Sequence, residues 1–120
     1  MSERTILVVD DEEINRLVAA LFLQQEGWAV DLAASGQEAL EKMAGHRYRC
    51  ALLDISMPGM SGIELCKTIQ GNGAWQATRL IAYTAHVLPD EQAAILQAGF
   101  DAIASKPTTR ASLLQAIQGS

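Results

Sequence analysis

The alternation of short apolar runs with longer segments of helical periodicity is the feature that most constrains the fold of this chain. Five short, mostly apolar runs are typical of strands, at residues 6–9, 28–32, 50–53, 80–83 and 102–104. In the segment after each run, apolar residues recur every three or four positions, as they do along one face of a helix. Strands that alternate with helices predict a parallel sheet, because each right-handed crossover returns the chain to the same end of the sheet.

The number of strand and helix units limits the fold further. Five units are too few for a closed eight-stranded barrel. We therefore expect an open, doubly wound α/β sheet of five parallel strands with helices on both faces, the flavodoxin-like (βα)5 arrangement with strand order 2-1-3-4-5. In such sheets the ligand crevice lies beyond the carboxyl ends of the strands. Functional residues are therefore expected directly after strands.

Local signals mark where three of the helices begin. Ser35 with Glu38, and Ser61 with Glu64, have the spacing of a capping box. Pro89 suits the first turn of a helix, where its missing N–H has no helical partner to lose. We expect helices directly after the two serines and from Pro89 onward.

Polar side chains follow four of the five predicted strands. They are Asp10 and Asp11 after the first strand, Asp54 after the third, Thr84 after the fourth and Lys106 after the fifth. The first and third strands are neighbours about 4.8 Å apart in this strand order, so the three carboxylates are expected to converge. Carboxylates this close repel one another by roughly a few kcal/mol per pair. The cluster therefore requires positive charge, for which the candidates are a divalent metal ion and Lys106.

Oxygen atoms are the only metal ligands that this cluster offers. Such ligands favour a hard ion, so we expect Mg²⁺, or alternatively Mn²⁺, rather than Zn²⁺. Mg²⁺ usually keeps waters and takes one or two carboxylates, which leaves a position for a phosphoryl oxygen. Lys106 and Thr84 are candidates to hold the other two phosphoryl oxygens. The pattern predicts transfer of a phosphoryl group to a carboxylate.

Each of these residues also has an ordinary structural explanation. Acidic residues at a helix N-terminus interact favourably with the helix dipole, and we prefer that explanation for Glu12 and Glu13. A lysine before proline can be a plain surface residue, and a threonine at a strand end a plain cap. Five such residues at one edge of one sheet favour a functional site.

The composition indicates one acidic domain and excludes several classes of protein. With 120 residues, 49% apolar and 19% charged, the chain is expected to form a single domain over residues 1–120. Its net charge of −5 argues against direct binding of nucleic acid, which requires clustered Lys and Arg. The longest apolar run, Leu17 to Leu23, is shorter than the roughly 20 residues that cross a bilayer. We expect a cytoplasmic domain without membrane contact, in which Cys50 and Cys66 are buried free thiols.

Four motifs together resemble the receiver domain of two-component response regulators, over almost the whole chain. They are Ile6-Leu7-Val8-Val9-Asp10-Asp11, Leu53-Asp54-Ile55-Ser56-Met57-Pro58-Gly59-Met60-Ser61-Gly62, Tyr83-Thr84-Ala85 and Ser105-Lys106-Pro107. The resemblance implies a domain that takes a phosphoryl group from the phosphohistidine of a histidine kinase or phosphotransfer domain and slowly hydrolyses the product. Such a domain catalyses its own phosphorylation and dephosphorylation without being a metabolic enzyme.

The same resemblance implies a role for each site residue. Asp54 is implied to be the phosphoacceptor. Asp11, Asp54 and the backbone carbonyl of Ser56 are implied to ligate Mg²⁺, with Asp10 acting through water. Lys106 is implied to pair with the phosphoryl oxygens and Thr84 to hydrogen-bond them. The peptide bond between Lys106 and Pro107 is implied to be cis.

Two shorter motifs are similar to receivers within hybrid sensor histidine kinases and phosphorelays. They are Asn15-Arg16 after the acidic run and Thr84-Ala85-His86 at the fourth strand. His86 itself is interpreted as a solvated loop residue rather than a phosphohistidine donor. The last predicted helix ends at Gln118 without a following linker. Both a stand-alone regulator and a domain of a longer protein therefore stay open. The hybrid-like motifs favour a domain of a longer protein.

One position departs from the pattern of the family. Three residues before Lys106, where many receivers carry Tyr or Phe, this chain has Ile103. A branched aliphatic side chain cannot make the aromatic swing that reports phosphorylation in those receivers. We expect a reduced conformational switch, as in a relay intermediate or a phosphate sink.

The sequence leaves the cognate kinase, the signal, the output and the oligomeric state open. Other functions also compete with phosphoryl transfer. The main alternative is a pseudo-receiver that binds partners without phosphorylation, but such domains usually lack one or more of the five site residues. A phosphatase that works through an aspartyl-phosphate needs a second acid two residues after the nucleophile, where this chain has Ser56. A flavin or nucleotide site requires a glycine-rich loop after the first strand, and this loop is acidic.

Overall fold

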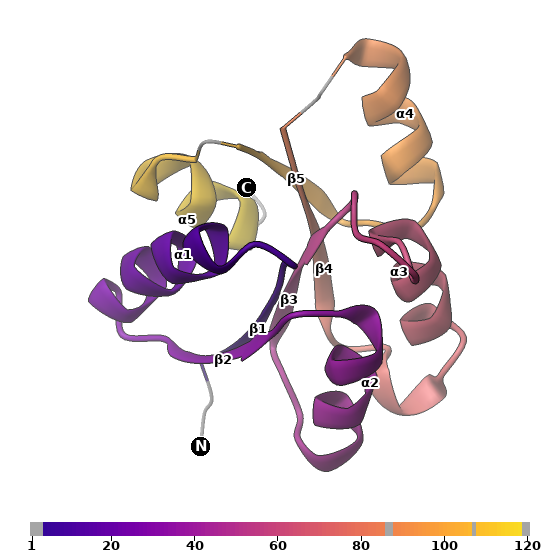
Figure 1. The fold of residues 1–120 in the computed structure, drawn as a ribbon, viewed down its shortest axis with the longest axis horizontal. Coiled ribbons are helices and arrows are strands. Elements are labelled where there is room, and N and C mark those ends of the chain that lie inside the picture. The colour runs from indigo at the N-terminus through magenta and orange to yellow at the C-terminus, as the bar shows by residue number, and fades with distance from the viewer. Residues whose placement is uncertain (1–3, 86–87, 107, 119–120) are drawn as a thin grey trace.

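The computed structural model describes residues 4–85, 88–106 and 108–118, in which strands and helices alternate along the chain (Figure 1). The elements are β1 (Thr5–Val9), α1 (Glu13–Gln25), β2 (Ala29–Ala33), α2 (Gly36–Gly45), β3 (Cys50–Asp54), α3 (Gly62–Gln70), the 3-10 helix η1 (Gly73–Trp75), β4 (Arg79–Thr84), α4 (Pro89–Gln97), β5 (Ala102–Ser105) and α5 (Arg110–Gln118). The strands pair in parallel in the order β2-β1-β3-β4-β5. The predicted doubly wound sheet and its strand order are confirmed.

Helices cover both faces of the sheet and enclose two apolar layers. Helices α1 and α5 lie on one face of the sheet (Figure 1). On that face Leu23 and Leu113 belong to the same buried cluster as Val8 and Leu52. Helices α2, α3 and α4 cover the other face. The central strands are buried on both faces, which explains why they read as continuous apolar runs in the sequence.

The helices begin close to the predicted signals, with one difference. Ser61 and Glu64 form the complete capping box. Ser35 Oγ accepts a hydrogen bond from the backbone N–H of Glu38, but the Glu38 carboxylate accepts from the N–H of Ala34 and not from that of Ser35. Helix α4 begins at Pro89 as expected. The 3-10 helix after α3 was not predicted, because a single short turn has no periodicity to detect.

Four of the apolar residues whose helical spacing indicates α1 face away from the core, whereas a fifth, Phe22, packs against it. The side chains that α1 buries are those of Ala19, Ala20 and Leu23. The exposed apolar residues are Ile14 (75%), Leu17 (52%), Val18 (39%) and Leu21 (55%), which we call the α1 apolar face. Two of the three buried residues are small alanines, and most of the larger apolar side chains of α1 stay outside the core.

Two further expectations have an outcome in the described part of the chain. Cys50 and Cys66 are buried free thiols, as predicted. Within residues 4–85, 88–106 and 108–118, no helix combines the length and apolar character needed to span a membrane.

Candidate functional site

The carboxyl ends of neighbouring strands bring three carboxylates together. The β1–β3 register places Asp10 beside Asp54, and Asp11 follows Asp10 in the chain. Each of the three offers one oxygen, and these oxygens lie within 4.8 Å of one another. Asp10 is fully buried and Asp54 nearly so, whereas Asp11 is exposed. The predicted convergence of the acidic residues is therefore found.

Lys106, which directly follows β5, supplies positive charge to this cluster. Its Nζ lies 2.8 Å from Asp10 Oδ2 and 3.2 Å from Asp54 Oδ1. No hydrogen bond from another described residue reaches Asp10 Oδ2, which is buried. Burial alone would lower the pKa of Lys106, but its contacts with Asp10 and Asp54 raise that pKa above its ordinary value. Lys106 is therefore a cation at neutral pH.

One lysine compensates this cluster only in part. Burial and, after it, the charge of Asp10 raise the pKa of Asp54 from 3.8 to about 6, although Lys106 and the backbone N–H of Ser56 act to lower it. The buried Asp10 Oδ2 has only the lysine as a partner among the described residues. A cluster of carboxylate oxygens that lacks positive charge fits a hard divalent cation. The donor set thus suits Mg²⁺ or Mn²⁺.

A shallow pocket of about 270 Å³ opens over the cluster. Its lining residues are Asp11, Glu12, Asp54, Ser56, Thr84, Ala85 and Lys106. The only predicted site residue outside this lining is Asp10, which is buried and bound to Lys106. The structure thus brings together all the residues that the strand-end pattern singled out, and Ser56 with them.

Helix α1 adds contacts that the sequence analysis did not predict. Glu12, for which the sequence favours a helix-dipole role, also lies at the pocket, and its carboxylate accepts a hydrogen bond from Asn15 Nδ2 at 2.7 Å. Its backbone N–H donates to Asp10 Oδ1 at 2.9 Å. Arg16 Nη1 donates to the backbone oxygen of Asp10 at 2.6 Å. The three-residue spacing from Glu12 to Asn15 is the signal that could have indicated the contact between these two side chains.

Helix α3 begins in direct contact with the end of β3. The N–H of Gly62 donates to the oxygen of Ile55 at 3.1 Å. A Cβ atom at Gly62 would lie 2.8 Å from the carbonyl carbon of Asp54 and closer still to its oxygen, so this approach requires glycine. In the segment between β3 and α3, the backbone N–H of Ser56 donates a hydrogen bond to Asp54 Oδ1 at 3.2 Å.

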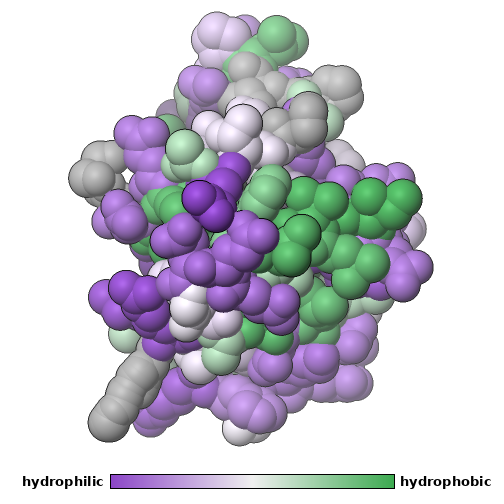
Figure 2. Space-filling view, turned by 90° about the vertical axis from the view of Figure 1, so that its left-hand side faces the viewer, coloured by the Kyte–Doolittle hydropathy of each residue, from purple (hydrophilic) through white to green (hydrophobic). Residues whose placement is uncertain are grey.

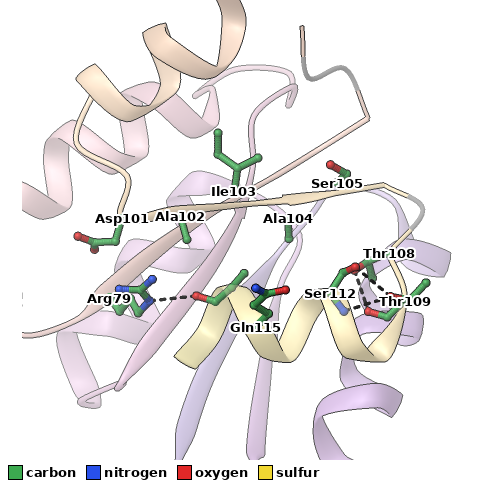
Figure 3. Close-up of a pocket in the computed structure, with 11 residues that line it drawn as sticks. Arg79, Asp101, Ala102, Ile103, Ala104, Ser105, Thr108, Thr109, Ser112 and Gln115 are labelled. Carbon is green, nitrogen blue, oxygen red and sulfur yellow. Dashed lines mark hydrogen bonds between the residues drawn. The ribbon is translucent and has the colours of Figure 1, made fainter. Parts of the chain in front are cut away.

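A larger hollow, of about 450 Å³, lies away from the site between β5 and α5 (Figure 3). Ala102 and Ala104 point toward α5 in this view, whereas Ile103 points to the opposite side, where it packs on the core beneath α2, α3 and α4. The reduced switch inferred from Ile103 stays a prediction. His86 and Pro107 lie outside the described residues, so the interpretation of His86 and the cis peptide bond also stay predictions.

Comparisons with known proteins agree with this architecture. The model of the response regulator receiver domain family matches residues 6–118. The sensor histidine kinase AruS of Pseudomonas aeruginosa is 35% identical over 119 residues, which are 98% of this chain but 12% of that protein. The chemotaxis protein CheY4 of Vibrio cholerae has a similar structure, with a TM-score of 0.91 at 28% identity and 98% of both chains covered.

A further solved structure with a similar fold is described with a metal ion in its active-site cleft. It is the receiver domain of the sensor histidine kinase PA1611 of Pseudomonas aeruginosa, described with a magnesium ion coordinated in its active-site cleft. The TM-score is 0.87 at 30% identity, with 98% of this chain and 96% of that chain covered. Since the family model spans nearly the whole chain and the fold matches that of a solved receiver domain, this chain belongs to the response regulator receiver domains of two-component phosphorelay signalling.

Proposed function

We propose that this domain accepts a phosphoryl group on Asp54 from the phosphohistidine of a histidine kinase or phosphotransfer domain, and later releases it to water. An Asp54 oxygen bonds to phosphorus while the phosphorus–nitrogen bond breaks, and the imidazole takes up a proton. In hydrolysis a water oxygen attacks phosphorus and the carboxylate leaves. The observation that carries the proposal is the position of Asp54, which lines the pocket with its Oδ1 3.2 Å from Lys106 Nζ.

Lys106 and Thr84 are the residues that would hold the transferred group. Phosphorylation adds roughly −1.5 to −2 charges, which need compensation in a site that already holds carboxylates. Lys106 contacts Asp54 directly, and Thr84 lines the same pocket. Asp10 remains as a second partner of Lys106 and keeps the ammonium group at the site.

Mg²⁺ is the cofactor that fits this site best, with Mn²⁺ as the alternative. The ligands would be Asp11, Asp54 and the backbone carbonyl of Ser56, with Asp10 acting through water. When bound, the ion neutralises negative charge on the carboxylates and on the phosphoryl group. The oxygens of the acidic cluster within 4.8 Å of one another support this assignment, as does the magnesium described for the PA1611 receiver.

The α1 apolar face supports a protein partner at this site. It starts within one helical turn of the acidic residues, because α1 begins at Glu13, two residues after Asp11. Figure 2 views the side of the molecule that carries α1 and shows apolar side chains gathered beside hydrophilic ones. A partner that presents a phosphohistidine to the pocket must cover the surface around it. We assign the α1 apolar face to contact with that partner.

Phosphorylation by a small donor tests the proposal without the partner. The protein is incubated with Mg²⁺ and acetyl phosphate, and the intact mass is measured beside Asp54→Asn and beside Asp90→Asn, an exposed aspartate on α4. We expect one added phosphoryl group on the wild type and on Asp90→Asn, and none on Asp54→Asn. A wild type that gains no mass would instead favour the pseudo-receiver, which binds partners without phosphorylation.

A further inference from the structure

The side chain of Lys106 reaches its two partners by crossing a neighbouring strand. Lys106 follows β5, whereas Asp54 ends β3 and Asp10 follows β1, so β4 lies between the lysine and both carboxylates. Adjacent parallel strands are about 4.8 Å apart, so the ammonium group meets the two carboxylates at the level of the intervening strand β4. The residue of β4 that lies beneath the Lys106 side chain is therefore the one that its charged end contacts.

Tyr83 occupies that position. It pairs with Asp54 on one side and with Ala104 on the other, and side chains in register on neighbouring strands point to the same face. Lys106 Nζ lies 4.9 Å from the centroid of the Tyr83 ring, a distance typical of a cation–π contact. The ring is buried and packs in the core beneath α1 and α5. It thus separates that apolar core from the charged end of Lys106.

The ammonium group is held on three sides by described residues. Asp10 and Asp54 contact it from β1 and β3, and the Tyr83 ring contacts it from β4. A lysine has a flexible four-carbon stem and a strongly hydrated charge, so its position is not fixed by its own covalent structure. Cation–π contacts strengthen when the cation is shielded from water, and the Lys106 side chain is only 13% exposed.

We propose that Tyr83 is a positioning residue that holds the Lys106 ammonium group over Asp54 through the face of its ring. The inference rests on the proposed function, because the benefit is a cation already in place when the phosphoryl group arrives. The aromatic ring carries this role and the hydroxyl group does not, since the contact is with the ring. Another aromatic side chain preserves the role, whereas an aliphatic side chain that merely fills the core does not.

Three variants of the 120-residue chain separate positioning from core packing. Tyr83→Phe keeps a ring, and Tyr83→Leu or Tyr83→Met keeps apolar volume without one. Affinity for beryllofluoride in the presence of Mg²⁺ and the initial rate with acetyl phosphate are measured for each. We expect Tyr83→Phe to stay within about twofold of the wild type, and both aliphatic variants to lose about tenfold, which corresponds to ~1.4 kcal/mol. Equal values for the ring and aliphatic variants would overturn the inference.

A double-mutant cycle and a spectroscopic measurement complete the test. In a Lys106→Met background, Tyr83→Leu should cause no further loss, because the cation that the ring holds is gone. A full loss in that background would show a purely structural effect. In the metal-free protein, the Lys106 Hε protons should show an upfield ring-current shift in the wild type and Tyr83→Phe, and not in Tyr83→Leu. This shift tests the contact even if the wild type accepts no phosphoryl group, and its absence in the wild type would overturn the inference.

Discussion

The role proposed for Asp54 requires an ionised carboxylate, yet the surroundings of Asp54 oppose its ionisation. Burial and the neighbouring Asp10 raise its pKa to about 6, so at pH 7 most molecules carry the charged form that a nucleophile requires. The same crowding of negative charge destabilises the metal-free cluster and favours the binding of a cation. The chemical properties of the site thus follow from the crowding of oxygen atoms at the strand ends.

The raised pKa of Asp54 predicts a pH-dependent stability of the metal-free protein. The folded state holds this proton more tightly than the unfolded chain, so the stability it contributes is fully present below about pH 4 and is lost as pH rises through about 6. Asp54→Asn removes this loss. In EDTA at pH 7, we expect urea unfolding to show the variant more stable by on the order of 2 kcal/mol.

Two comparisons check the origin of this difference. At pH 4 the gap between Asp54→Asn and the wild type should shrink, because Asp54 is then almost fully protonated in the folded chain and no longer adds negative charge to the cluster. Asp90→Asn, at an exposed position in the first turn of α4, should not stabilise the protein. An equal gap at pH 4 and pH 7 would be inconsistent with crowding of charge as the cause.

Helix α1 contributes to the site at its N-terminus and offers an unburied apolar face along its length. We expect Leu17→Gln with Leu21→Gln to slow transfer from a purified, phosphorylated histidine phosphotransfer domain by about tenfold, since buried apolar contacts at the centre of an interface carry much of its affinity. Phosphorylation by acetyl phosphate should be unchanged, because no partner surface is needed.

Leu96→Gln on α4 is the matched control for these α1 substitutions. Leu96 is 49% exposed, close to the values for Leu17 and Leu21, but lies on a helix at the other face of the sheet. Its variant should leave transfer from both donors unchanged. Equal slowing by the α1 and α4 substitutions would argue against a specific contact at the α1 apolar face.

The junction of β3 and α3 depends on the absence of a side chain at Gly62. Gly62→Ala would press a Cβ against the carbonyl group of Asp54, so we expect urea unfolding to show a loss of about 1–3 kcal/mol. Gly45→Ala is the control, because a Cβ at the end of α2 meets no atom within 4 Å. If both variants keep wild-type stability, the close approach of α3 to β3 is not a constraint.

The sequence predicts the sheet and most of the site because both follow from local patterns. Apolar runs give the strands, helical periodicity gives the crossovers, and a polar residue after a strand is carried to the sheet edge by topology alone. The contact of Tyr83 with Lys106 is different, since it depends on how far a side chain reaches across a neighbouring strand. The exposed side of α1 could not be predicted either, because its alanines and its larger apolar residues both recur with helical spacing.

At the scale of the whole molecule, two buried thiols allow the packing of the core to be tested. Burial raises the pKa of Cys50 and of Cys66 from 9.0 to about 11. The stability linked to these neutral thiols is fully present below about pH 9 and is lost as pH rises toward 11. We expect neither thiol to react with a disulfide reagent at pH 8 unless urea unfolds the protein. A rapid reaction of either thiol in the native state would contradict the burial of these side chains in the core. Cys66→Ala should remove part of the loss of stability at alkaline pH.

The central claim is that one constellation at the strand ends holds a cation and a phosphoryl group on Asp54. A crystal structure with Mg²⁺ and beryllofluoride, which mimics the phosphoryl group, tests it most directly. The account predicts beryllium bonded to an Asp54 oxygen, the metal in contact with Asp11, Asp54 and the Ser56 carbonyl, and Lys106 and Thr84 on the fluorine atoms. Beryllofluoride bound elsewhere, or a metal held without Asp54, would contradict the account.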